Sequence, residues 1–214
     1  MTASTLPRLL CAAEDPGPSG EILTASGATV FEWPGATLLP GLIDSHTHLS
    51  MDGSLENYLD RMTDSVPVLT LRATAMMRRD LLSGITTCRC LGDREFLDIA
   101  CREAVEKNEV AGPRLLVATR GIRAPEGHGF VGYPFKGKEE IKKAIHENIT
   151  RGADLIKIMA TGGVMTPGVN PEDAHYTAEE MAAGVAEGRR FHKRSASHAQ
   201  GAEGILNAVR AGVD

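Results

Sequence analysis

The chain has 214 residues, of which 24% are charged, and a formal net charge of −5 at pH 7. This length suits one domain or two small ones and is sufficient to bury a core. The negative charge gives no general affinity for nucleic acid or for an anionic membrane, so neither partner is expected. No stretch approaches the ~20 apolar residues of a membrane span, and the first thirty residues lack the pattern of a secretory signal.

The four cysteines, at positions 11, 88, 90 and 101, form no even disulfide framework, which favours a reducing, cytoplasmic location. Cys88 and Cys90 are interpreted as small core residues, because no second cysteine pair completes a zinc site.

Residues 1–36 show little periodic pattern: a turn-rich break is expected over 15–20 and short strands over 21–32. After residue 49, helices and strands alternate. Apolar spacing and turn residues predict helices over 66–82, 94–108, 138–151, 177–192 and 202–211, and strands over 85–91, 114–119, 155–160 and 194–198. Residues 212–214 resemble the entrance to a sixth strand. This alternation predicts repeated βαβ units and a parallel sheet.

The first strand carries a pair of histidines. Pro40 and Gly41 break the chain, an apolar run follows, and the strand ends in His46 and His48. Side chains two residues apart on a strand project from the same face, with Cα atoms ~7 Å apart, which suits two imidazoles that bind one ion. Asp44 shares that face. The alternative is a pair of surface histidines in a turn.

A second candidate group lies within the strand predicted inside residues 153–163. Lys157 is in its middle and, by alternation, shares a face with Leu155 and Met159, while the two isoleucines beside it point the other way. A buried ammonium is costly, so it lowers its pKa or finds a partner. A neutral amine reacts with carbon dioxide to give a carbamate, which can bridge two metal ions. The alternative is a salt bridge to a buried acid.

The candidate residues share one position relative to the strands. His46 and His48 follow the first strand, His128 lies in the loop after the third, Lys157 is on the fourth and His198 ends the fifth. A (β/α)8 TIM-type barrel carries its active site at the C-terminal ends of its strands, where such residues converge. In an open doubly wound sheet they would spread along a line. Convergence therefore favours the barrel, of which this chain supplies about five to six β/α units.

Four stretches occur together in a recognisable order: PGLIDSHTHL at 40–49, GITT at 84–87, IKI with TGG within 156–163, and SHAQG at 197–201. They resemble the metal-dependent amidohydrolase superfamily, and most closely its imidazolonepropionase-like, prolidase-like branch, which hydrolyses dipeptides and related amides. The resemblance implies that residues 39–214 form part of a metal-dependent hydrolase barrel. It also implies that residues 1–38 contribute to a small β-sandwich.

The resemblance assigns a role to each candidate residue. It implies that His46 and His48 bind the more buried of two divalent metal ions, with Zn²⁺ expected. It implies that Lys157, as its carbamate, bridges the two ions and that His198 binds the second. His128, flanked by glycines, resembles the histidine that family members point at the substrate carbonyl, so His128 and Lys157 are the expected catalytic residues. Gln200 stands where relatives often carry another histidine.

The implied reaction is hydrolysis of the amide or peptide bond of a dipeptide-like or N-acyl amino acid substrate by a metal-bridging hydroxide. The family adds a metal-binding histidine after strand six and an aspartate after strand eight, and neither position occurs before Asp214. We therefore expect either a missing C-terminal segment or pieces that associate as a homo-oligomer. The alternative is a catalytically incomplete fragment that acts as a structural half of a barrel.

The remaining polar residues carry weaker expectations. Arg120 and Arg123 are close enough to His128 in sequence to meet a substrate carboxylate, although solvated loop arginines are the commoner case. His146 and His192 belong to charged helical segments and are expected to be solvated.

Overall fold

The computed structural model describes residues 37, 39–54, 56, 58–129 and 132–214. The chain divides into two compact units, Met1–Leu39 and Pro40–Asp214, and the described helices and strands belong to the second. The turn-rich break expected at 15–20, the strands expected over 21–32 and nearly all of the expected β-sandwich portion over 1–38 lie outside the described residues. They stay predictions.

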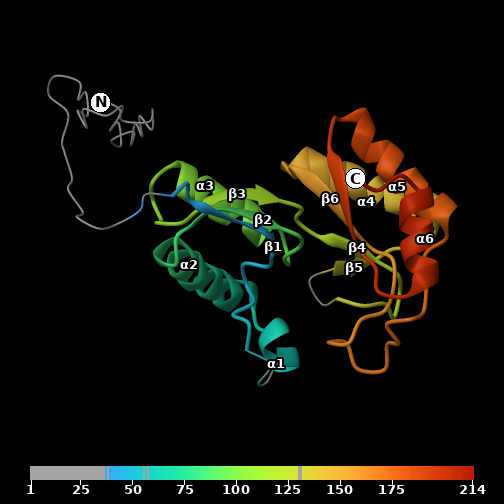
Figure 1. Ribbon diagram of the computed structural model, residues 1–214, viewed down its shortest axis with the longest axis horizontal. Helices are drawn as coiled ribbons and strands as arrows, with labels where there is room; N and C mark the ends of the chain where they lie inside the picture. The colour runs from blue at the N-terminus through green and yellow to red at the C-terminus, as the bar shows by residue number, and fades with distance from the viewer. Residues whose placement is uncertain (1–36, 38, 55, 57, 130–131) are drawn as a thin grey trace, which may run out of the picture. The chain divides into compact units, whose positions relative to one another are not determined.

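The second unit alternates strands and helices along the chain (Figure 1). The strands are β1 (Leu42–Thr47), β2 (Ile85–Cys90), β3 (Arg114–Val117), β4 (Gly121–Arg123), β5 (Gly132–Pro134), β6 (Leu155–Met159) and β7 (Arg194–His198). The helices are α1 (Tyr58–Met62), α2 (Val66–Leu82), α3 (Leu97–Glu106), α4 (Gly137–Arg151), α5 (Ala178–Arg190) and α6 (Ala202–Arg210).

The strands form two parallel sheets, β1-β2-β3 and β5-β4-β6-β7. The sheets are joined where the Asp154 N–H, just before β6, donates to the Val117 carbonyl at the end of β3 (2.8 Å). The Asp154 carboxylate also accepts from the Val117 N–H (2.9 Å) and pairs with Arg102 of α3 (2.7 Å). These bonds confirm the α/β fold with parallel strands. Within the described chain, β1 and β7 each lie at a sheet edge, and the barrel is not closed.

The strand predicted over 114–119 ends two residues early, at Val117. Thr119 adopts a φ of 61°, a left-handed conformation that a β-branched residue rarely takes and that interrupts the strand. Before Thr119, β3 pairs with β2, whereas β4, which begins two residues after it, pairs with β5 and β6. The segment 114–123 therefore contributes one strand to each sheet.

Helices cover the sheets through two main apolar clusters. The first joins buried side chains of α2, α3, β2 and β3, and the second joins α4, α5 and α6 to β4 and β6. Alternation along β6 divides its residues between clusters as predicted: Met159 packs in the first, while Ile156 and Ile158 pack in the second.

Several predicted boundaries are confirmed and others shift for local reasons. Helix α2 spans the predicted residues, and α5 begins with the expected capping box, in which Thr177 and Glu180 bond each other's backbone N–H groups. Helix α3 begins at Leu97 rather than residue 94, because Glu95 and Phe96 have positive φ angles of 50° and 59°. The short elements α1, β4 and β5 were not predicted.

Three cysteines confirm the expected core role. Cys88 and Cys90 are completely buried, and Cys101 of α3 packs in the same cluster. Burial raises the pKa of Cys88 and of Cys101 to about 12, with nearby carboxylates adding to the shift, and it raises the pKa of Cys90 as well. These thiols are protonated at neutral pH.

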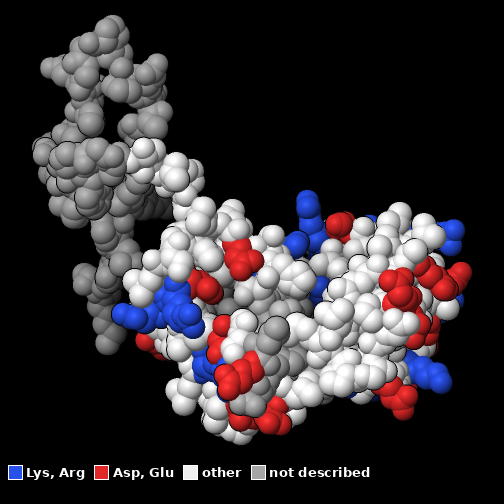
Figure 2. Space-filling model, turned by 60° about the horizontal axis from the view of Figure 1, so that its bottom comes forward, with Lys and Arg blue, Asp and Glu red and all other residues white. Residues whose placement is uncertain are grey.

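The described surface carries charges of both signs and several exposed apolar side chains. On the face in Figure 2, lysine and arginine side chains alternate with aspartate and glutamate. Large exposed apolar side chains occur on the first and the last element of the described chain: Leu42 and Ile43 on β1, and Leu206 and Val209 on α6. No helix among the described residues is long and apolar enough to cross a membrane.

Two fully buried carboxylates hold the loops that leave the strands. Asp93 accepts hydrogen bonds from the N–H groups of Leu49 (2.8 Å) and Ser50 (3.2 Å), just after β1. Asp98 accepts from the Thr119 N–H (2.9 Å) after β3. Burial raises the pKa of Asp93 to about 6, and burial together with the charge of Asp93 raises the pKa of Asp98 to about 7.

The packing of α4 gives a first prediction. Ile145 is completely buried and its Cδ1 atom lies against Gly184 of α5. Ile145→Ala is expected to lower the free energy of unfolding by ~2–5 kcal/mol, because it removes buried apolar surface and leaves a cavity. Ile205→Ala on α6, where the side chain is 44% exposed, is the matched control and is expected to cost much less. Urea denaturation measures both, and equal losses would contradict this packing.

The buried carboxylates give a second prediction. The pKa of Asp98 is raised in the folded chain, so its contribution to stability is present below pH ~4 and is lost as the pH rises to about 7. Between these values, the wild type is expected to lose unfolding free energy relative to Asp98→Asn, whose amide oxygen still accepts from Thr119. Urea denaturation across this pH range, with the exposed Asp60→Asn as control, tests the slope. Parallel pH profiles for wild type and Asp98→Asn would refute it.

Candidate functional site

The predicted site residues lie on the strands or in the loops that follow them. His46 is in β1 and His48 follows it, Lys157 is on β6, and His198 ends β7. His128 lies in the loop between β4 and β5. The parallel order of these strands brings the ends of β6 and β7 to the same edge, with Met159 opposite His198 in the register.

His46 and His48 form one pair. Their ring centroids are 5.5 Å apart, and the rings meet edge to face. The Nδ1 atom of His48 lies 2.7 Å from the Gly92 carbonyl oxygen, so Nδ1 donates and Nε2 keeps its lone pair. A backbone carbonyl that orients a histidine in this way is typical of metal-binding imidazoles. The Asp44 carboxylate accepts from the His46 N–H (2.9 Å) and so serves the backbone of the strand.

His128 and His198 form a second pair, with ring centroids 4.3 Å apart. The Nε2 atom of His198 is 3.0 Å from the Gly162 carbonyl oxygen, and the Nδ1 atom of His128 is 2.8 Å from the Thr166 hydroxyl. A Cβ atom at Gly163 would lie 2.5 Å from the His128 ring. Glycine at position 163 is therefore required for His128 to occupy this position.

Lys157 lies in a strand whose residues are all buried, and it is itself 1% exposed. Its Nζ atom has no hydrogen-bond partner among the residues that the structure describes. The alternative interpretation, a salt bridge to a buried acid, is therefore not formed within the described chain. Burial, with a smaller contribution from Arg89, lowers the pKa of Lys157 to about 8.

The electrostatics connect this lysine to both histidine pairs. Burial, to which the charge of Lys157 adds, lowers the pKa of His46, His48 and His128 to about 4. The same two causes lower the pKa of His198. These imidazoles are neutral at pH 7, which is the form that binds metal ions.

The donor set fits a metal site that includes a modified lysine. Among the described residues, no group of three or more His, Cys, Asp or Glu side chains has a metal-binding arrangement. The four histidines instead form two pairs, and the charge of Lys157 lowers the pKa of every one of them. A buried amine without a partner, beside neutral imidazoles, is a position where a carbamate would supply the oxygen ligands that the histidines lack.

Other polar residues named from the sequence have structural roles. Arg120 pairs with Glu147 (2.7 Å) and lies over the Phe96 ring (4.5 Å), and Arg123 donates to the Gly132 carbonyl (3.2 Å). Both arginines therefore make contacts within the fold. His146 is 55% exposed and contacts Glu187 (3.1 Å), His192 is exposed, and the Gln200 N–H donates to Thr161 (3.0 Å).

The sequence alone did not indicate two further site residues, Asp93 and Thr166. Asp93 follows Gly92, whose carbonyl orients His48, and its carboxylate fixes the backbone beyond that histidine. Thr166 lies in the loop after β6 and contacts His128. A polar residue directly after a strand was the available signal for Asp93, but no local pattern marks Thr166.

Comparison with known proteins places this arrangement in a family. The sequence pattern of the Amidohydrolase family matches residues 37–214. Ochratoxinase from Aspergillus niger is 28% identical over 205 residues, covering 82% of this chain and 42% of that protein. The chain thus spans less than half the length of this curated relative.

Solved structures show the same likeness. A prolidase in complex with N-methylphosphonate-L-proline superposes with a TM-score of 0.82 at 26% identity, covering 91% of this chain and 51% of that one. A Xaa-Pro dipeptidase with bound methionine in its active site superposes with a TM-score of 0.72 at 29% identity, covering 82% and 47%. Since the family pattern extends over most of its length, the chain belongs to the amidohydrolase family.

Proposed function

We propose that the protein is a metal-dependent hydrolase that cleaves the amide or peptide bond of a dipeptide-like or N-acyl amino acid substrate. The observation that carries the proposal is the buried Nζ atom of Lys157, which has no partner in the part of the chain that the structure describes and lies beside two pairs of neutral histidines. Relatives named prolidase and Xaa-Pro dipeptidase support a peptide bond as the target. The chain spans about half the length of these relatives, and the proposed activity is that of a complete barrel.

Each side chain has a proposed role toward two divalent metal ions, for which Zn²⁺ is the expected identity. His46 and His48 would hold one ion, His198 the other, and the carbamate of Lys157 both. The carbamate forms when the neutral amine of Lys157 attacks carbon dioxide: a nitrogen–carbon bond forms and one proton leaves Nζ. The bound ions would activate water and polarise the substrate carbonyl.

The described hydrogen bonds support a role for His128 toward the substrate. The Thr166 hydroxyl oxygen accepts from the Gly129 N–H (3.2 Å), so its own proton is free to be donated to Nδ1 of His128, 2.8 Å away. Nε2 of the neutral ring then carries the proton. His128 is thereby prepared to donate a hydrogen bond to a substrate carbonyl, which becomes more negative as the amide is attacked.

The proposal predicts a carbamate on one particular lysine. In ¹³C-bicarbonate buffer with added zinc, the wild type is expected to show a carbamate ¹³C resonance that Lys157→Met lacks. Lys143→Met, which alters an exposed lysine of α4, is the matched control and should keep the resonance. A resonance that persists in Lys157→Met would contradict the assignment, and so would its absence from the wild type.

Hydrolysis provides the corresponding test of activity. Lys157→Ala is expected to reduce hydrolysis of N-acyl amino acids and Xaa-Pro dipeptides by more than the roughly 10–100-fold typical of losing an outer partner of a metal ligand. Short carboxylates should restore part of the rate. Full metal content and full activity in Lys157→Ala would overturn the proposed function. A chain without activity that binds no zinc would favour a structural half-barrel.

A further inference from the structure

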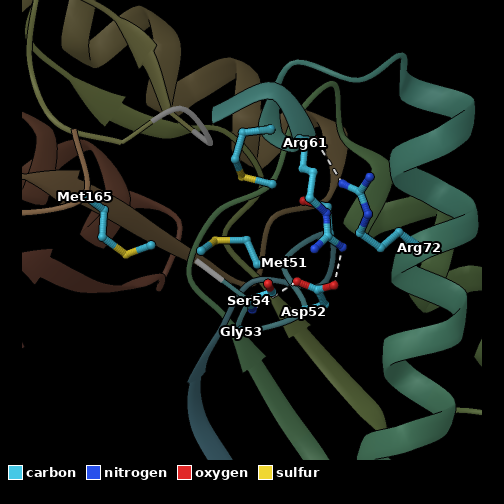
Figure 3. A pocket seen from close by; sticks show the side chains of 9 residues that line it. Met51, Asp52, Gly53, Ser54, Arg61, Arg72 and Met165 are labelled. Carbon is cyan, nitrogen blue, oxygen red and sulfur yellow. Dashed lines mark hydrogen bonds and ion pairs between the residues drawn. The ribbon is translucent and has the colours of Figure 1, made fainter. Parts of the chain in front are cut away.

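A cavity lined by methionines lies beside the candidate site. It has a volume of about 200 Å³ and is bounded by the loop after β1, helices α1 and α2, and the loop after β6. Of the eight methionines in the chain, Met51, Met62 and Met165 line it. In Figure 3, Met51 and Met165 extend toward the same space from opposite sides.

Two of the methionines that line this cavity are neighbours, along the chain, of residues in the two histidine pairs or of their partners. On one side, the Met51 N–H donates to the His48 carbonyl (3.1 Å), so Met51 lies within one turn of a proposed metal ligand. On the other side, Met165 precedes Thr166, whose hydroxyl is 2.8 Å from Nδ1 of His128. A substrate whose carbonyl meets His128 therefore has its neighbouring groups close to the methionines.

The charged residues around the cavity neutralise one another. Arg61 pairs with Asp52, and Arg72 pairs with Asp64 and also donates to the Arg61 carbonyl (2.8 Å). The hydrogen bond from Arg61 lowers the pKa of Asp52. Each guanidinium thus has its own carboxylate, with which an anionic ligand would have to compete. The free surface of the cavity is mainly apolar, and three of its nine lining residues are methionines.

These observations define the group that fits. Methionine is flexible and polarisable, so it adapts to different apolar shapes and makes favourable contacts with aromatic rings. A charged or strongly polar group would lose its hydration without gaining a partner. We propose that this cavity binds an uncharged aliphatic or aromatic side chain of the substrate and that Met51, Met62 and Met165 determine specificity. The inference rests on the proposed function, because it assumes that the amide lies against His128.

The test uses methionine methyl groups as reporters. The chain is labelled with ε-¹³C-methionine, kept in EDTA so that metal-dependent turnover does not alter the probe, and titrated with N-acetyl-L-leucine or N-acetyl-L-aspartate. N-acetyl-L-leucine is expected to shift the methyl resonances of Met51, Met62 and Met165. The core residues Met77 and Met181 are the internal controls and should not move. N-acetyl-L-aspartate has the same α-carboxylate but a charged side chain in place of the isobutyl group, and it should leave the cavity resonances unchanged.

A matched pair of variants measures the contribution of one wall. Met165→Gln keeps the length of the side chain but adds an amide, and it is expected to weaken N-acetyl-L-leucine binding about tenfold. Met76→Gln on α2, outside the cavity, should leave binding unchanged. Absent methyl shifts, equal shifts with the aspartate probe, or equal effects of the two variants would overturn the inference. Selective shifts without hydrolysis after zinc is restored would support the cavity and count against the proposed function.

Discussion

The arrangement depends on a lysine placed where an ammonium ion is unfavourable. Lys157 is enclosed by strand β6 and its neighbours, and its Nζ atom has no partner among the described residues. An isolated buried charge costs several kcal/mol, so such a position persists when the amine is neutral or chemically modified. Four imidazoles whose pKa values are also lowered surround the same region. Burying these groups lowers the stability of the folded chain, and metal ions that bind them would raise it again.

The fold supports this placement through the direction of its strands. Parallel strands bring their C-terminal ends to one edge; His46, His48 and His198 lie at such ends, and Lys157 lies two residues before the end of β6. Buried carboxylates then fix the backbone just beyond: Asp93 holds the residues after His48, and Asp98 holds Thr119 between β3 and β4. The positions of the imidazoles therefore depend on hydrogen bonds to residues distant in sequence.

Regular periodicity made much of this structure predictable. The alternation around Lys157, the apolar spacing of α2 and the capping box of α5 each appear in the structure as expected. The motifs that carry the family resemblance contain three of the four histidines of the candidate site, His46, His48 and His198. Irregular features were not predictable: the left-handed Thr119 between β3 and β4 has no local signal, and β4 and β5 are too short for a period. Thr166 and Met165 become neighbours of the site through a loop path that only tertiary contacts determine.

The buried thiols have a practical consequence for work with zinc. Cys88, Cys90 and Cys101 are enclosed in the core and protonated at neutral pH, whereas alkylating reagents, oxidants and soft metal ions react with accessible thiolates. In the folded state these cysteines should neither sequester added zinc nor react with maleimides. Maleimide modification at any of the three is thus a direct indicator that the core has opened, and it can be followed alongside metal reconstitution without disturbing the histidines.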